Sequence, residues 1–330
     1  MNQVSRPALE GSIAVRDGRR LGFAEFGSPG GPAIIWMHGT PGARRQIPVE
    51  ARAYADREGL RIIGVDRPGI GSSTPHVYES VLDWTEDLAM VADTLGIAEM
   101  HLIGLSGGGP YVLAAGAAMP DRVRGVAVMG GVAPTQGVDA PPGGLVSLAA
   151  HLAPLVTVAR VPIGIVLTVA LRFLAPLGGP ALDLYASLQP EGDKDLLGRP
   201  EFKAMFLDDL LNGSRRQVTA PLSDLILFSR HWGFTAADVT VPVRWWHGDD
   251  DHIVPHRHGE HMVKILPDAT LRTIEGESHL SGLGLTEEIL RVLMELSGRQ
   301  EPGAGGPDAC KTISENCGVK VAPEVEVGSQ

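Results

Sequence analysis

The stretch MHLIGLSGGGPYVLAAGAA, residues 100–118, decides the fold of this chain. Met100–Leu105 predicts a buried strand, and the residues from Tyr111 to Ala118 predict a helix. The tight turn between them holds Ser106 in a strained backbone conformation that pushes its hydroxyl out above the sheet. Such a turn needs small residues two positions before and two positions after the serine, where this chain has Gly104 and Gly108. The pentapeptide GLSGG is common by chance, so its meaning depends on what surrounds it.

Strands and helices alternate on both sides of this stretch. A buried strand is predicted over Ala33–Met37, and further strands are predicted over Arg61–Val65, Val123–Met129, Val241–Trp246 and Ala269–Ile274. Helices are predicted within Ala43–Leu60, over Ser80–Gly96 and Gly259–Leu266, and around Ile289, Leu293 and Leu296. Near the N-terminus, Ser12–Val15 and Leu21–Phe26 flank an Asp17-Gly18 turn and predict a hairpin. The fold class is therefore α/β, with a doubly wound and mostly parallel sheet.

One long segment does not fit the alternation. The residues between Ala133 and Thr235 are too many for a loop and too apolar for a linker, so they predict an inserted helical cap. We expect a core of residues 1–135 and 236–300, a cap of residues 136–235, and a flexible tail of residues 301–330 that is rich in Gly, Pro and Glu.

Composition excludes several classes of protein. The chain has 330 residues and a net charge of −11, which disfavours nucleic acid as a partner. Its two cysteines, Cys310 and Cys317, both lie in the tail, so the core has no Cys-ligated metal and the fold needs no disulfide. The start of the chain, Met1–Ser12, lacks an apolar signal region, and we therefore expect a cytoplasmic location.

The predicted cap contains a lipophilic stretch. From Gly143 to Pro176 the only charged residues are Arg160 and Arg172. The longest uncharged part, Leu145–Ala159, is too short to span a bilayer, which takes about 20 apolar residues. We expect cap helices that are buried or that touch a membrane transiently.

The loop His38-Gly39-Thr40-Pro41-Gly42 follows an earlier strand. If Ser106 attacks a carbonyl, the resulting oxyanion needs two N–H donors. One donor would be Gly107, next to the serine, and the other would be Thr40, because Pro41 has no N–H. We assign His38 a scaffolding role.

Two further loops follow strands that are predicted late in the chain. The loop HGDDDHIVP, residues 247–255, offers Asp249, Asp250 and Asp251 as a candidate acid, and the loop EGESHL, residues 275–280, offers His279 as a base. A serine nucleophile needs a base to accept its proton, and the base needs an orienting carboxylate. The order Ser, Asp, His along the chain is the order used by one α/β enzyme fold.

Two rival motifs are weaker. His252, His256, His258 and His261 are close in sequence, but no HExxH motif is present. Neither the glycines at 69–71 nor those at 107–109 complete GxGxxG, and no Walker motif occurs. We expect no metal and no other cofactor.

The loops together resemble the α/β-hydrolase superfamily, and in particular its cap-bearing esterases, lipases and relatives. The matching segments are HGTPG, VDRPGIGSS, GLSGGGP, HGDDDHIVP and ESHL, which occur in the family's order between residues 38 and 280. The resemblance implies Ser106 as nucleophile, Asp251 as the acid, His279 as the base, and Thr40 and Gly107 as oxyanion donors. The family's acid precedes x-x-Val-Pro, which selects Asp251 from the three aspartates.

The resemblance also implies a reaction class. We expect a serine hydrolase that cleaves a carboxylic ester, thioester or lactone carrying a hydrophobic group. Proline iminopeptidases are similar through their HGGPG loop, but their DQRG motif is replaced here by Asp66-Arg67-Pro68-Gly69. Cofactor-free haloperoxidases, carbon–carbon bond hydrolases and acyltransferases share the triad and remain alternatives, as does a non-catalytic ligand-binding protein of the same fold.

Overall fold

The computed structural model describes residues 6–141, 153–174, 177–214, 218–297 and 320–321. In this part of the chain one sheet has the strand order β8-β7-β6-β5-β3-β4-β2-β1-β9. The strands are β1 (Leu9–Ala14), β2 (Arg20–Gly27), β3 (Ala33–Met37), β4 (Arg61–Val65), β5 (Met100–Leu105), β6 (Val123–Met129), β7 (Val243–Gly248), β8 (Ala269–Ile274) and β9 (Lys320–Val321).

The sheet is mostly parallel, as the sequence predicts. Strands β3 to β8 pair in parallel, whereas β2 pairs antiparallel with both β1 and β4. The Asp17-Gly18 turn has positive φ at both residues and joins β1 to β2, which confirms the predicted hairpin. Alternate side chains of one strand enter separate core clusters, Ile35 on one face and Trp36 on the other. A sheet buried on both faces in this way has strands of continuous apolar sequence.

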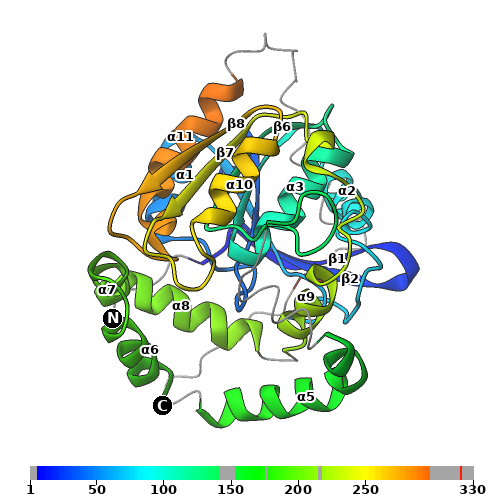
Figure 1. The fold of residues 1–330 in the computed structure, drawn as a ribbon. Coiled ribbons are helices and arrows are strands. Elements are labelled where there is room, and N and C mark those ends of the chain that lie inside the picture. Colours follow the sequence, from blue (N-terminus) through cyan, green and yellow to red (C-terminus); the bar gives the residue numbers. More distant parts are fainter. Residues whose placement is uncertain (1–5, 142–152, 175–176, 215–217, 298–319, 322–330) are drawn as a thin grey trace.

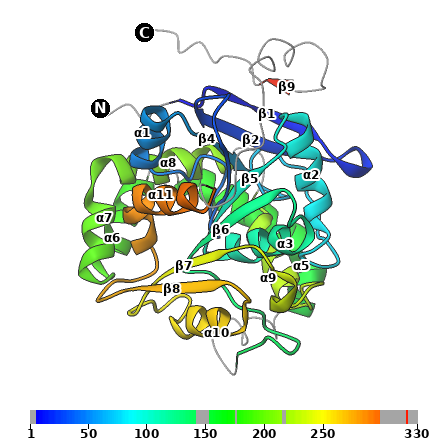
Figure 2. The ribbon, with the colours of Figure 1, turned by 90° about the horizontal axis from the view of Figure 1, so that it is seen from above.

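Helices cover both faces of the sheet. The helices of the alternating part are α1 (Val49–Glu58), α2 (Trp84–Thr94), α3 (Gly109–Ala118), α10 (Arg257–Ile265) and α11 (Thr286–Ser297). Figure 2 shows α1 and α11 on one side of the sheet and α2 and α3 on the other. The arrangement confirms a doubly wound α/β fold.

Two helix boundaries differ from the sequence prediction. Helix α2 begins at Trp84 and not near Ser80; Asp83 stands at the N-cap position without a side-chain cap hydrogen bond, and its carboxylate accepts the N–H of Ser80. Helix α1 begins only at Val49. The preceding residues form a loop because the N–H groups of Ala43 and Arg45 bond a distant carboxylate, that of Asp209.

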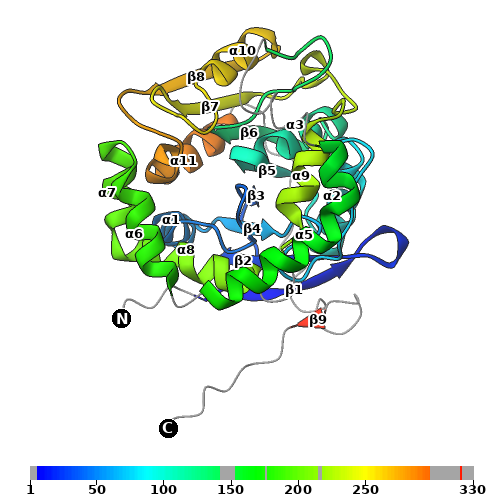
Figure 3. The same cartoon turned by 60° about the horizontal axis from the view of Figure 1, so that its bottom comes forward.

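Helices fill the long segment between β6 and β7. They are α5 (Ala153–Leu174), α6 (Gly178–Ser187), α7 (Glu191–Gly198), α8 (Pro200–Gly213) and α9 (Ala220–Phe228). They gather on one side of the molecule, below the sheet in Figure 1, and Figure 3 brings that side forward. Within the described residues no helix is long and apolar enough to cross a membrane.

The predicted tail lies outside the described residues except for Lys320–Val321, which pairs antiparallel with β1. Both cysteines, Cys310 and Cys317, also lie outside the described residues.

Candidate active site

Ser106 sits on the sharp turn between β5 and α3, in the left-handed region with φ +52°. Its neighbours explain why the turn is so rich in glycine. A Cβ on Gly104 would lie 2.6 Å from Val112 Cγ2, and a Cβ on Gly108 would overlap the carbonyl oxygen of Met37. Any side chain at these two positions would collide with its neighbours, so only glycine fits there. The serine between them adopts the strained conformation that the sequence predicts.

A short contact joins two of the other predicted residues. His279 Nδ1 lies 2.6 Å from Asp251 Oδ2, and the second oxygen of Asp251 accepts the N–H groups of Ile253 and Val254. Both side chains are buried. This hydrogen bond puts the proton on Nδ1 of His279 and leaves Nε2 free to accept another proton.

The neighbouring aspartates have other partners. Asp249 accepts the N–H of Gly276, and Asp250 lies 3.3 Å from the exposed His252. Of the three aspartates in this loop, Asp251 is thus the one that contacts His279.

Sequence reasoning missed the role of His247. Its Nε2 lies 2.8 Å from the carbonyl of Val254 and 3.2 Å from Asp251 Oδ2. Its Nδ1 accepts the indole N–H of Trp245 at 3.2 Å. Because an indole N–H only donates, His247 must carry its proton on Nε2, facing Asp251. The Trp-x-His spacing along β7 is the local signal that could have pointed to this contact.

These contacts set the charge of Asp251. Burial by itself would raise the pKa of this carboxyl, but the hydrogen bonds from His247 and His279 outweigh burial. The net effect lowers the pKa of Asp251. The carboxylate therefore stays ionised at neutral pH, as an orienting acid requires.

The sheet brings the serine and the histidine to the same edge. Leu105 on β5 is in register with Met129 on β6, so Ser106 and Gly130 continue neighbouring strands. A Cβ on Gly130 would lie only 3.3 Å from His279 Nδ1. In the described part of the chain, the Ser106 hydroxyl makes no hydrogen bond to His279. Such bonds are often long in free enzymes and shorten when substrate binds.

The two predicted oxyanion residues are also neighbours. A Cβ on Gly107 would lie 2.5 Å from Thr40 Oγ1, which places this loop against the serine turn. His38 is buried, with Nδ1 2.8 Å from the carbonyl of Gly39 and Nε2 accepting the N–H of Arg67. Burial and the charge of Arg67 hold the pKa of His38 well below its usual value. A neutral histidine that bridges two loops agrees with a scaffolding role.

One inserted helix reaches the histidine. Asp193 on α7 is fully buried, and its Oδ2 accepts the N–H of Leu280, the residue after His279. Burial raises the pKa of this carboxyl. No sequence pattern pointed to Asp193, because the contact joins residues that are 87 positions apart.

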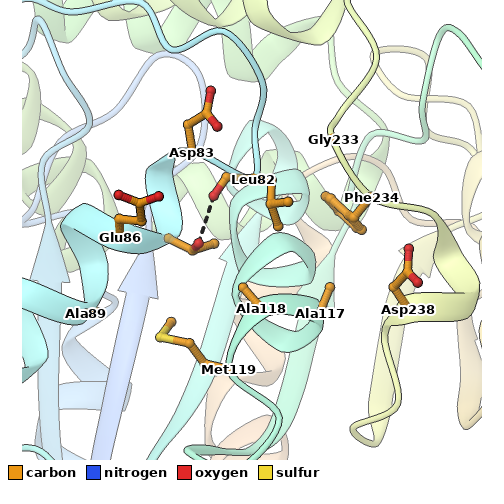
Figure 4. A pocket seen from close by; sticks show the side chains of 11 residues that line it. Leu82, Asp83, Glu86, Ala89, Ala117, Ala118, Met119, Gly233, Phe234 and Asp238 are labelled. Carbon is orange, nitrogen blue, oxygen red and sulfur yellow. Dashed lines mark hydrogen bonds between the residues drawn. The ribbon is translucent and has the colours of Figure 1, made fainter.

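Two hollows bear on substrate binding. An apolar cavity of about 280 Å³ adjoins the loop of Thr40 and is lined by Pro41, Gly42, Ile70, Leu167, Asp209, Leu210, Gly213, Ser214, Val218 and Pro221. A larger hollow of about 610 Å³ lies at the other end of α3, between residues such as Glu86, Met119 and Phe234 (Figure 4). Helix α3, ten residues and about 15 Å long, runs from the serine turn to this hollow. The apolar cavity is therefore the one that adjoins the candidate site.

The four clustered histidines have separate partners. His256 lies against Thr273, His258 accepts the N–H of Ala133, and His261 lies against the carbonyl of Asp139. Across the residues that the structure describes, no group of three or more His, Cys, Asp or Glu side chains could hold a metal ion.

Comparison with known proteins bears on the family and the fold. The sequence model of the family described as alpha/beta hydrolase fold matches residues 32–151, which include the Thr40 loop and the Ser106 turn. Residues 32–151 are therefore similar to the α/β-hydrolase family, and the sheet and helices of the described residues are consistent with the α/β-hydrolase fold. This similarity supports an enzyme of the α/β-hydrolase type.

Two curated relatives align with different fractions of this chain. A proline iminopeptidase from Neisseria meningitidis is 29% identical over 133 residues, 39% of this chain. The chain spans only about two fifths of that relative's length, since the match covers 42% of it. A 2-hydroxy-6-oxononadienedioate/2-hydroxy-6-oxononatrienedioate hydrolase from Burkholderia vietnamiensis is 28% identical over 85% of this chain and 92% of its own.

Solved structures agree on the fold. A thermophilic esterase from Thermogutta terrifontis has a TM-score of 0.60 and 20% identity, with 88% of this chain and 98% of its own covered. A bromoperoxidase from Bacillus anthracis has a TM-score of 0.62 and 21% identity, and the alignment covers 87% of this chain and 99% of the bromoperoxidase. At these identities the likeness concerns the fold and not the substrate.

Proposed function

We propose that this protein is a serine hydrolase that cleaves a carboxylic ester, thioester or lactone through an acyl-enzyme on Ser106. The observation that carries the proposal is the 2.6 Å contact between His279 and Asp251, at the sheet edge where Ser106 stands in its strained turn. A base oriented by an ionised acid, at the same sheet edge as a serine held in a strained turn, is what acyl transfer requires.

The reaction proceeds in two steps. Ser106 Oγ attacks the carbonyl carbon while His279 Nε2 takes the hydroxyl proton, and the N–H groups of Thr40 and Gly107 hold the oxyanion. His279 then protonates the leaving oxygen, or the leaving sulfur of a thioester, and the bond from the carbonyl carbon to that atom breaks. Water attacks the acyl-enzyme with the same base and the same oxyanion donors, and this attack releases the acid and restores the serine.

The apolar cavity supports a hydrophobic group on the substrate. It adjoins Pro41, one residue from the proposed oxyanion donor Thr40, and its exposed lining is almost entirely apolar. An acyl or alkyl chain placed there would leave water favourably, at about 25 cal/mol per Å² of buried surface.

A panel of p-nitrophenyl esters of rising chain length tests the proposal. We expect Ser106→Ala to lower kcat/KM by at least about 10³-fold. Ser187→Ala, which removes an exposed hydroxyl from α6, is the matched control and should match the wild type. A fluorophosphonate should label Ser106 in the wild type. Equal rates in Ser106→Ala and the wild type would overturn the mechanism, and an unlabelled wild type would favour a ligand-binding protein.

A carbon–carbon bond hydrolase is the second candidate. It is favoured by the Burkholderia relative, which aligns over 92% of its own length, whereas the iminopeptidase match covers 42%. Incubation with 2-hydroxy-6-oxononadienedioate separates the two candidates. Turnover of this compound with inert p-nitrophenyl esters would select the second candidate.

A further inference from the structure

The side chain of Thr40 forms hydrogen bonds with two buried side chains, those of Asp224 and Arg67. Its hydroxyl donates to Asp224 Oδ2 at 2.8 Å and accepts from Arg67 Nη2 at 2.6 Å. The same Arg67 nitrogen donates to the carbonyl of Gly39 at 2.8 Å. The two residues at the centre of the loop are thus held by three hydrogen bonds to buried groups.

Arg67 and Asp224 form a buried ion pair. Arg67 Nη2 lies 3.1 Å from Asp224 Oδ2, and the two side chains are 1% and 3% exposed. Tyr111 donates to the other carboxylate oxygen at 2.8 Å. Every oxygen of this carboxylate therefore has a partner, and each partner lies close to the serine turn or to the Thr40 loop.

Asp224 belongs to the inserted helix α9, which is itself tied to the core. The N–H groups of Thr219 and Ala220, at the start of α9, bond the carbonyl of Gly69 at 2.8 and 3.2 Å. Gly69 lies two residues after Arg67, so α9 holds the loop that carries the arginine as well as the arginine itself.

A second inserted helix holds the far end of the same loop. Asp209 on α8 accepts the N–H of Ala43 at 2.8 Å and of Arg45 at 3.0 Å. Burial raises the pKa of Asp209 to about 7 and also raises the pKa of Asp224. Buried carboxylates are costly, and an apolar contact of the same shape would hold two elements together at lower cost.

The buried ion pair between Arg67 and Asp224 lies next to the proposed oxyanion site. A Cβ on Gly107 would lie 2.5 Å from Thr40 Oγ1 and 3.4 Å from Arg67 Nη1. The buried cluster therefore stands directly beside both proposed oxyanion donors. A displacement of about 1 Å at such a donor can cost on the order of 10²-fold in rate.

We propose that Asp224 is a positioning residue, supplied by the inserted helix α9, that holds Thr40 through its hydroxyl and through Arg67 so that the oxyanion site is formed. The proposal rests on the proposed function for its kinetic consequence, but its structural core does not. Loss of the carboxylate leaves Arg67 buried without its counter-ion and frees the Thr40 hydroxyl.

The kinetic test compares Asp224→Asn with Thr40→Val on p-nitrophenyl butyrate. We expect each to lower kcat about 10- to 100-fold with KM within about twofold, because oxyanion contacts strengthen only in the transition state. Binding of a trifluoromethyl ketone, which forms a tetrahedral oxyanion, should weaken in the same proportion, while binding of the matching unreactive amide should not. Thr40→Ser should regain most of the activity.

The double variant Thr40→Val/Asp224→Asn measures whether the two residues act together. We expect it to be no slower than the slower single variant. Asp183→Asn is the matched control, since it makes the same change in an exposed ion pair on α6. Effects that multiply in the double variant, or an equal loss of ketone and amide binding, would overturn the proposal.

Hydrogen exchange separates this proposal from the proposed function. If the wild type hydrolyses no ester, amide hydrogen exchange in a peptide covering residues 38–46 still measures how firmly the Thr40 loop is held. We expect faster exchange in Asp224→Asn than in the wild type and no change in Asp183→Asn. Unchanged exchange in Asp224→Asn would contradict the positioning role whatever the reaction.

Discussion

The inserted helices fall into two unlike regions. On α7 and α8, Leu197, Phe202 and Met205 are at most 1% exposed and join the same core cluster as Trp36 of the sheet. On α5, Val158 is 85% exposed and Phe173 is 80% exposed. The inserted helices between β6 and β7 therefore do not form one separate layer, because some of them pack into the same core as the sheet.

The contrast extends to charge. The inner helices α7, α8 and α9 each bring a buried aspartate to a loop of the candidate site, whereas α5 has no acidic residue. The inner helices thus complete the site from within the core. The outer helix presents an apolar face, and such faces often mark contacts with other molecules.

The largest expected effect lies where no inserted helix takes part. Asp251 receives its hydrogen bonds from His247, His279 and the loop after it, all in the core. Asp251→Asn should lower kcat/KM by about 10²- to 10⁴-fold, because the amide favours the wrong tautomer of His279. Steady-state kinetics on p-nitrophenyl butyrate measure this loss.

The lowered pKa of Asp251 predicts how the stability of the protein depends on pH. The pKa of this carboxyl is lowered in the folded protein, so the stability that its charge contributes is present above about pH 4 and is lost as the pH falls further. Thermal unfolding of the wild type and of Asp251→Asn should therefore differ most at pH 5 to 7 and converge in acid. A difference that grew as the pH fell would contradict the assigned pKa direction.

Phe202→Ala tests whether α8 belongs to the core. Phe202 is 1% exposed, and its truncation should lower the free energy of unfolding by about 3–5 kcal/mol. Urea unfolding followed by tryptophan fluorescence measures the change. A loss below about 1 kcal/mol would show that the inner helices pack as loosely as the outer one, which would remove the contrast.

The smallest effect is expected on α5. The double variant Val158→Ser/Phe173→Ser should change the unfolding free energy by no more than about 0.5 kcal/mol per site, because both side chains are mostly exposed. Its kcat/KM for p-nitrophenyl butyrate should stay near that of the wild type.

The same double variant tests membrane contact through α5. We propose that this face binds a neutral lipid surface transiently, since the net charge of −11 disfavours anionic lipids. Sedimentation with phosphatidylcholine vesicles should fall several-fold in the variant. Equal sedimentation of wild type and variant would exclude this face as the contact.

The elements that the sequence predicted well are those set by local physics. Strands β3, β4, β5, β6 and β8 have the predicted bounds. For β3, β4 and β5 the reason is that strands covered on both faces are short, largely apolar runs between turns, whereas β8 is an edge strand with no buried residue. The helix expected from Ser80 was too long, since the N–H groups of Trp84 and Thr85 bond carbonyls three residues back, as in a turn, before the α-helical pattern begins.

The amino-acid sequence was enough to predict the order of the strands and helices along the chain, the strained turn at Ser106 and the short set of residues from which a site could be built. The contact between His279 and Asp251, and the approach of Asp193, Asp209 and Asp224 to the neighbouring loops, are visible only in the folded chain. Apolar periodicity reports which face of an element is buried but not what buries it. The contact between Thr40 and Asp224 joins residues 184 positions apart, and it exists only because α9 packs against the loop after β4.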